Sequence, residues 1–392
     1  MVSPSIDIPP GILPLTRDLA EIRLSDYNAA TMSNNPSQHI TRRQALELLG
    51  IGAAATALPS MAFAQAPTFP RGAVIRTILK DYAPEELAGG ATLFHEHMQL
   101  APDFNATFSA ASNAVRVANG LAPNPARGGG GGAGAPDIMH NVDLMSAEVA
   151  KVKDAGIACI VDAGHPDMGR DVEFLRQVSM KSGVPIVVGG GFYSQPWYPK
   201  EISTMSEEQI LQALIKQADD DVLGAFGEIG SWDEITSDER KVFRAIGKAH
   251  VATNIPIFTH TGIPGKSALE QLDILEDAGV NPNRVIIGHL GNLVDTNVYV
   301  HKTICRRGGY VGFDRQGNND TQQIPMVMSL IEAGFADHLM FSADGSSGYS
   351  KTVTVFLPKL KAAGASDEVL RRIMVDNPRR FLAFVPKRPR RK

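Results

Sequence analysis

Apolar runs of strand length alternate along this chain with longer segments of helical periodicity. Strand-like runs lie at 91–97, 157–163, 185–192, 225–230, 255–261, 285–290, 309–314 and 339–344. Helical segments lie at 141–155, 206–223, 236–252, 266–279, 295–308 and 351–363. This regular alternation predicts an α/β fold, a parallel (β/α)8 or TIM barrel. A doubly wound open sheet is the alternative, but it would not bring the ends of widely separated strands to one mouth.

Residues that bind metal ions well end five of these eight runs. A parallel barrel gathers the carboxyl ends of its strands at one mouth, so we expect these side chains to meet. Successive strand residues face opposite sides, so the two imidazoles of the first run point together while Glu96 points away. Imidazoles with carboxylates predict a site for Zn²⁺ or a neighbouring transition ion. The six residues are His95, His97, Glu228, His260, His289 and Asp344.

The first part of the chain has the features of an export signal. Arg42 and Arg43 form a twin-arginine pair, a weakly apolar stretch follows from Leu46 to Leu58, and 62–64 (Ala-Phe-Ala) is a cleavage signature. We therefore expect an unrelated extension at 1–31, a start at Met32, and a twin-arginine signal at 32–66. The protein would be periplasmic or secreted, without stable membrane insertion, because the apolar stretch is short and interrupted by Gly and Pro.

The mature part divides into the predicted barrel domain at 67–386 and a basic tail at 387–392, which we expect to be solvated. A long connection at 98–140, after the first strand, contains five consecutive glycines at 128–132. This Gly-rich loop is expected to be either a flexible surface loop or a mobile flap near the barrel mouth. The net charge of -4 implies no nucleic-acid partner, so a small-molecule substrate is expected.

Together these motifs resemble the phosphotriesterase-like branch of the amidohydrolase superfamily. The resemblance spans about residues 74–382 and includes TLFHEH, GRD at 169–171, GFY at 191–193, THT, IGHLG, FDR and NPRRFL. It implies a TIM barrel with two divalent metal ions, most simply zinc. His95, His97 and Asp344 would hold the buried ion, and His260 and His289 the exposed one. Members of the family are often homodimers.

Glu228 stands where the best-known members carry a carboxylated lysine that bridges the two ions. The resemblance is therefore to a glutamate-bridged subgroup, and activity cannot be carried over from the lysine enzymes. It implies a metal-bridging hydroxide that attacks the substrate, with Asp344 accepting its proton. His165, after the second strand, is either a partner of a metal ligand or an ordinary loop residue.

Tyr193 and Arg315 match positions that help to seat the substrate in phosphotriesterase-like lactonases, although Asn292 replaces an aspartate of that group. Packing under a loop and a salt bridge at the rim are the alternatives for these two residues. The leading prediction is hydrolysis of a lactone or another carboxylic ester, with weak phosphotriesterase activity. A true organophosphate phosphotriesterase, an N-acyl amidohydrolase and a non-catalytic metal-binding or scaffold protein of the periplasm are the alternatives.

Overall fold

The structure is a computed structural model that describes residues 66–124, 137–262, 265–293, 295, 297–317 and 319–390. The predicted extension at 1–31, nearly all of the predicted export signal at 32–66 and the glycine run at 128–132 lie outside these residues. Among the helices that the structure describes, none combines the length and the apolar character needed to cross a membrane.

The strands form a parallel barrel, and helices lie in the connections between neighbouring strands. Their order is β3-β4-β5 in one group and β6-β7-β8-β9-β10 in the other, and every pair within a group is parallel. All eight predicted strands are confirmed within a few residues. They are β3 (Ala91–Glu96), β4 (Ile157–Asp162), β5 (Ile186–Val188), β6 (Phe226–Ser231), β7 (Ile257–Thr261), β8 (Val285–Ile287), β9 (Tyr310–Phe313) and β10 (Leu339–Phe341).

Backbone hydrogen bonds join the two groups at both seams. At the seam between β5 and β6, Gly227 N donates to Gly190 O at 2.8 Å. At the seam between β10 and β3, His97 N donates to Gly345 O at 2.9 Å and Asp344 N donates to His95 O at 3.2 Å. The second seam therefore places the first and the last metal-ligand candidates side by side.

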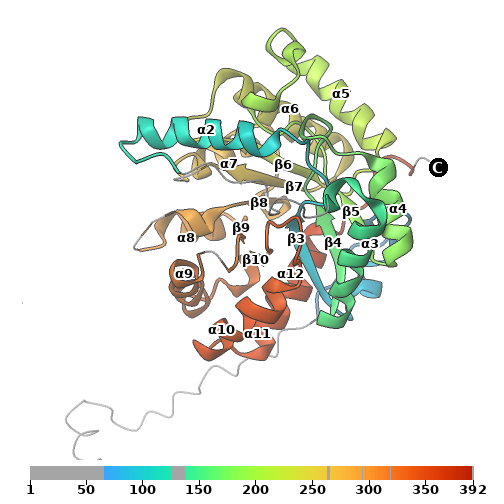
Figure 1. Ribbon diagram of the computed structural model, residues 1–392, viewed down its shortest axis with the longest axis vertical. Helices are drawn as coiled ribbons and strands as arrows, with labels where there is room; N and C mark the ends of the chain where they lie inside the picture. The colour runs from blue at the N-terminus through green and yellow to red at the C-terminus, as the bar shows by residue number, and fades with distance from the viewer. Residues whose placement is uncertain are drawn as a thin grey trace, which may run out of the picture. The chain divides into compact units, whose positions relative to one another are not determined.

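Helices surround the strands, as Figure 1 shows. Several begin with strong N-terminal caps: Ser206 with Gln209 and Thr236 with Glu239 form reciprocal capping boxes at α5 and α6. The α-helices are α2 (Phe104–Ala118), α3 (Val142–Ala150), α4 (Val172–Ser182), α5 (Glu207–Asp220), α6 (Ser237–Thr253), α7 (Ala268–Asp277), α8 (Tyr299–Arg306), α9 (Asp320–Glu332), α10 (Leu357–Ala362), α11 (Asp367–Arg371) and α12 (Asn377–Leu382). A short antiparallel hairpin, β1 (Ile75–Arg76) with β2 (Asp81–Tyr82), precedes the barrel.

The pleat of each strand divides its apolar residues between two cores. In β10, Leu339 and Phe341 pack outward in a core shared with the helices, whereas Met340 belongs to a second core with Phe94 of β3 and Ile286 of β8. Strands buried on both faces read as continuous apolar runs rather than alternating ones. This explains why the runs were recognisable in the sequence.

Two segments show structure that the sequence analysis did not predict. Residues 104–118 of the Gly-rich connection form helix α2, because Phe104, Phe108, Ala111 and Val115 recur at helical spacing and pack beside the barrel mouth. The basic C-terminal segment is exposed at 387–389 but carries ion pairs. Arg388 pairs with Asp219 at 2.6 Å, and Arg390 pairs with Asp81 at 2.8 Å and donates to two backbone carbonyls.

Candidate metal centre

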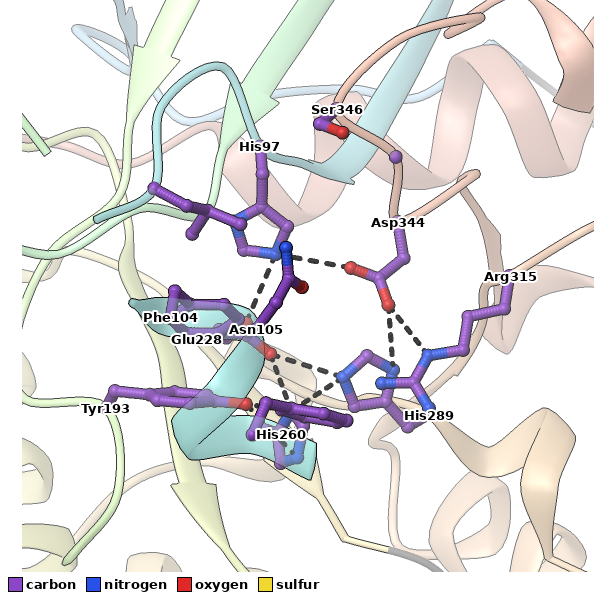
Figure 2. A pocket seen from close by; sticks show the side chains of 13 residues that line it. His97, Phe104, Asn105, Tyr193, Glu228, His260, His289, Arg315, Asp344 and Ser346 are labelled. Carbon is purple, nitrogen blue, oxygen red and sulfur yellow. Dashed lines mark hydrogen bonds and ion pairs between the residues drawn. The ribbon is translucent and has the colours of Figure 1, made fainter. Parts of the chain in front are cut away.

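The six residues predicted to bind metal ions converge at the carboxyl ends of five strands. Three come from within strands β3, β6 and β7, and His97, His289 and Asp344 come from the residues just after β3, β8 and β10. All are buried except Asp344, whose side chain is 11% exposed at the cavity. Figure 2 shows five of them around one space, with Glu228 reaching in from β6.

The first half-site consists of His95, His97, Asp344 and the carboxylate of Glu228. His97 Nε2 lies 3.3 Å from Glu228 Oε1 and 3.2 Å from Asp344 Oδ1. His95 Nε2 lies 3.3 Å from Glu228 Oε2 and 3.6 Å from Asp344 Oδ1. A tetrahedral zinc ion with bonds near 2.0–2.1 Å separates its ligand atoms by about 3.3 Å. These donor atoms therefore fit around one ion.

The second half-site consists of His260, His289 and the same carboxylate. His260 Nδ1 and His289 Nε2 lie 2.8 Å and 3.2 Å from Glu228 Oε2, and 2.7 Å from each other. The nitrogen and oxygen atoms of these three residues all lie within 4.8 Å of one another. Glu228 is shared with the first half-site, so its carboxylate can connect two ions.

Unpartnered nitrogen atoms support the fit to metal ions. Both ring nitrogens of His95 and Nδ1 of His97 are buried without a hydrogen-bond partner. An unpaired buried polar group costs about 1–3 kcal/mol, and a bound ion would remove that cost for nitrogens that face the shared carboxylate. Four imidazoles and two carboxylates are ligands suited to zinc and its neighbours.

The pKa values of the two imidazoles of the second half-site are shifted in opposite directions. Burial and the nearby His289 lower the pKa of His260 to about 4. Burial also acts to lower the pKa of His289, but the adjacent Asp314 raises it to about 9. Two protons cannot sit between nitrogens 2.7 Å apart. A divalent ion can hold both nitrogens at once, which is a further reason to place one here.

Burial alone would raise the pKa of Glu228, but the surrounding imidazoles, His95 and His260 first among them, hold it well below its usual range. The carboxylate is therefore charged at neutral pH although its side chain is only 2% exposed. An ionised bridging group is what two cations require.

Two further carboxylates, Asp314 and Glu96, hold the metal-ligand candidates in place by hydrogen bonds. Asp314 accepts from His289 Nδ1 at 2.7 Å and from His289 N at 3.0 Å, which fixes the ring so that Nε2 faces the centre. Glu96 points away from the imidazoles, as expected. Its two oxygens accept from Ser342 Oγ, Ala343 N and Gly345 N at 2.8–2.9 Å and so hold the turn that carries Asp344.

Three residues of the site adopt left-handed backbone conformations, each just after a strand. They are His289 with φ 60°, Arg315 with φ 61° and Asp344 with φ 50°. Such conformations cost about 1–2 kcal/mol for residues other than glycine and gather at functional sites. The hydrogen bonds to Asp314 offset this strain at His289. The hydrogen bonds to Glu96 offset it by holding the residues on either side of Asp344.

Tyr193 and Arg315 both reach the centre. Tyr193 Oη lies 3.1 Å from His260 Nδ1, and Arg315 Nε donates to Asp344 Oδ2 at 2.8 Å. Arg315 therefore forms a salt bridge, but with a metal-ligand candidate rather than at the outer rim. His165 is fully buried beside Asp167, with 3.8 Å between Nδ1 and Oδ1, and no hydrogen bond joins it to the six ligand candidates within the described residues.

A cavity of about 150 Å³ opens above the centre. Its floor is formed by Glu228, His260 and His289, and one wall by Arg315 and Asp344. Helix α2 and the residues before it contribute Leu100, Phe104, Asn105 and Phe108. The other lining residues are His97, Tyr193, Gly345 and Ser346. The sequence analysis missed this contribution of α2; the four-residue spacing of its phenylalanines was the signal that could have revealed it.

A TIM barrel with such a centre at its mouth defines a metal-dependent hydrolase. The phosphotriesterase family matches residues 82–382. The chain belongs to this family, whose enzymes act with binuclear metal centres, and the predicted resemblance is confirmed.

Three relatives illustrate the range of activities nearby. The chain is 29% identical over 285 residues to the N-acetyltaurine hydrolase of Dictyostelium discoideum, covering 63% of this chain and 76% of the relative. It is 30% identical over 270 residues to the aryldialkylphosphatase of Saccharolobus solfataricus, covering 60% and 84%. The solved phosphotriesterase homology protein of Escherichia coli, with phosphate in its active site, superimposes with a TM-score of 0.64 at 25% identity, covering 77% of this chain and all of that chain.

The shared carboxylate can be tested by counting metal ions. Wild-type protein loaded with zinc and dialysed should retain about two ions per chain, and Glu228→Gln should retain about one or none because the amide cannot carry the bridging charge. Elemental analysis measures the ratio. Glu208→Gln, an exposed acid on α5, is the control and should match the wild type. Full retention of both ions by Glu228→Gln would contradict the bridging role.

The clamp formed by Glu96 is tested by Glu96→Gln. An amide N–H₂ would replace one of the acceptor oxygens that face Ser342 Oγ, Ala343 N and Gly345 N, so the turn that carries Asp344 should loosen. We expect about 10-fold or more weaker metal retention against a chelator and a free energy of unfolding lower by about 1–3 kcal/mol. Unchanged values in both measurements would rule the clamp out.

Proposed function

We propose that this protein hydrolyses a compact carboxylic ester, with lactones as the first class to test. The observation that carries the proposal is the pair of half-sites that share Glu228 at the floor of a cavity of about 150 Å³. Ligand sites for larger organic molecules commonly occupy about 300–1,000 Å³. A planar carbonyl compound fits the smaller space better than a phosphotriester, whose three substituents spread in three directions.

Two divalent ions, for which zinc is our proposal, would be held by His95, His97 and Asp344 on one side and by His260 and His289 on the other. When bound, they supply polarisation of the scissile carbonyl and activation of water. The residues of the chain supply the orientation: Glu228 fixes the separation of the half-sites, and Tyr193 and Arg315 border the space in which the substrate lies.

Asp344 presents an ionised carboxylate that can accept a proton. Burial alone would raise the pKa of Asp344, but the guanidinium of Arg315 at 2.8 Å and the nearby imidazoles hold it well below its usual range. The carboxylate is therefore ionised over the whole neutral range. Its Oδ1 faces His97 and its Oδ2 faces Arg315, so Arg315 also fixes the direction in which Asp344 presents its oxygens. General-base action of this kind contributes about 10²–10⁴-fold to a rate.

Hydrolysis of an N-acyl amide is the second candidate. The relatives named N-acetyltaurine hydrolase favour it, because that name describes hydrolysis of an N-acetyl compound. Phosphotriester cleavage would be a weaker side activity, for which the aryldialkylphosphatase of Saccharolobus solfataricus is the precedent among the relatives. The same centre would serve all three reactions, so only substrate comparison separates them.

We also propose that the enzyme is exported by the twin-arginine route to the periplasm or beyond, and that it forms a homodimer. The export proposal rests on Arg42, Arg43 and the cleavage signature at 62–64. A route that transports folded proteins suits a site loaded with metal before export. The dimer rests on the family resemblance alone, and sedimentation of the mature protein measures it.

The substrate class is tested with zinc-loaded mature protein and a panel of lactones, carboxylic esters, N-acetyl amines and aryl phosphotriesters. We expect the highest kcat/KM on a lactone or carboxylic ester, because those substrates present one planar carbonyl to the centre. A higher value on N-acetyl amines would move the assignment to the second candidate. No turnover of any class by protein that carries two ions would contradict the proposal.

Asp344→Asn tests the proton acceptor. The amide keeps an oxygen that can face a metal ion but has lost the basic carboxylate, so we expect most of the metal to remain while kcat falls by about 100-fold or more. Elemental analysis and steady-state kinetics on the same sample separate the two effects. An unchanged rate at full metal content would exclude Asp344 from proton transfer.

Export is tested by replacing the arginine pair with lysines, Arg42→Lys together with Arg43→Lys, in the source organism. Wild-type protein should appear outside the cytoplasm with a new N-terminus near residue 65 or 67, and the double variant should remain inside as precursor. N-terminal sequencing and cell fractionation give both results. Wild-type protein that keeps Met32 and stays in the cytoplasm would overturn the export proposal.

A further inference from the structure

Helix α2 and the aromatic residues behind it cover one side of the metal cavity. We propose that this aromatic roof, defined as Phe104, Phe108, Trp197 and Trp232, selects acyl substrates that carry a ring-sized apolar group beside the scissile carbonyl. The inference rests on the proposed hydrolase function and names the substrate class within it. The barrel strands supply the reaction centre, and the inserted helix supplies the selection.

The roof is anchored at both ends, so it is part of the resting site. At the start of α2, Ala101 N donates to Met168 O at 2.7 Å in the loop after β4. Gly169 permits this approach, because a Cβ there would lie 2.6 Å from Ala101 N. Beyond the end of α2, Asn119 Nδ2 donates to Asp233 Oδ2 at 2.8 Å, after β6, and Lys266 Nζ donates to Asn119 Oδ1 at 2.6 Å, after β7.

The rings form a continuous apolar surface. Phe104 and Phe108 line the cavity with their centroids 6.1 Å apart. Trp197 lies 5.2 Å behind Phe104, Trp232 lies 5.5 Å from Phe108, and the two indoles stack at 13°. Aromatic pairs of this kind stabilise one another beyond the burial of area, which favours a roof of fixed shape.

The size of the cavity sets the size of the group. An apolar cavity of about 150 Å³ accommodates benzene, and the space above the metal centre has the same volume. A six-membered ring placed against Phe104 and Phe108 would leave its attached carbonyl directed toward Glu228 and the imidazoles at the floor.

Polar groups beside the roof favour one orientation of such a group. The guanidinium carbon of Arg315 lies 5.9 Å from the centroid of Phe108, so a cation borders the aromatic surface. Figure 2 shows Asn105 beside Phe104, with its amide directed toward the space between His97 and Asp344. A carbonyl or carboxylate oxygen is favoured at this side, and a cationic group is disfavoured. An aromatic carboxylic acid or its ester would place its ring against Phe104 and Phe108 and its oxygens toward Arg315 and Asn105.

The chain carries its own reporter for this proposal. Trp197 and Trp232 are its only two tryptophans, and both belong to the roof. Titration of the zinc-loaded protein with benzoate should change the tryptophan fluorescence in a saturable way, and acetate should bind about 10-fold or more weakly because it lacks the ring. This readout is independent of turnover.

Phe108→Ala should weaken benzoate binding by about 10-fold and leave acetate binding unchanged. Phe108→Leu keeps most of the volume and serves if the alanine variant fails to fold. Val117→Ala, on the exposed side of α2 with 60% of the residue accessible, is the matched control and should behave as wild type. Equal affinities for benzoate and acetate, or no effect of either Phe108 variant on benzoate, would overturn the roof as the selecting element.

Kinetics distinguish failure of this inference from failure of the proposed function. If wild-type protein hydrolyses esters but Phe108→Ala leaves the ratio of kcat/KM for phenyl-bearing and acetyl esters unchanged, the roof does not select and the hydrolase assignment stands. If benzoate binds in a Phe108-dependent way and no acyl compound is cleaved, the roof is supported and the proposed function fails.

Discussion

One buried, ionised carboxylate organises the mouth of this barrel. Glu228 is nearly inaccessible, and all four imidazoles of the centre lie within 3.3 Å of its oxygens. Burying such a charge is costly unless opposite charge surrounds it. The convergence of the strand ends supplies the imidazoles, and two cations would complete the compensation. The distances between half-sites, the ionisation of the ligands and the position of the cavity all follow from this shared group.

The centre depends on a second set of groups that never face the cavity. Asp314 and Glu96 hold His289 and the turn around Asp344 through hydrogen bonds of 2.7–3.0 Å. Both supported residues have left-handed backbone conformations, which an unsupported loop would abandon at a gain of about 1–2 kcal/mol. The support comes from another strand or strand end, so the pairing of the strands also positions the site.

The fold and the ligand set were accessible from the sequence because both obey local rules. Strands buried on two faces give continuous apolar runs, and parallel strands bring their carboxyl ends together, so six ligand candidates could be named from position alone. The role of Glu96 could not be predicted, because it depends on the register between β3 and β10, nearly 250 residues apart. Helix α2 lies in the same connection as the glycine run, and the whole connection was therefore predicted to be a loop. The ion pairs of Arg388 and Arg390 depend on which acidic residues lie near the tail in the folded protein, and the basic composition of the tail does not reveal this.

Helix α2 gives this member of the phosphotriesterase family a cavity bounded by aromatic rings on one side and by a cation on the other, above a centre shared with relatives of different activities. The proposed function depends on two metal ions occupying that centre. Anomalous X-ray diffraction from crystals of zinc-loaded protein measures this occupancy most directly. We expect two zinc peaks, one on each side of Glu228. One peak should lie against His95, His97 and Asp344, and the other against His260 and His289. A single peak, or a second ion bound away from His260 and His289, would contradict the proposal.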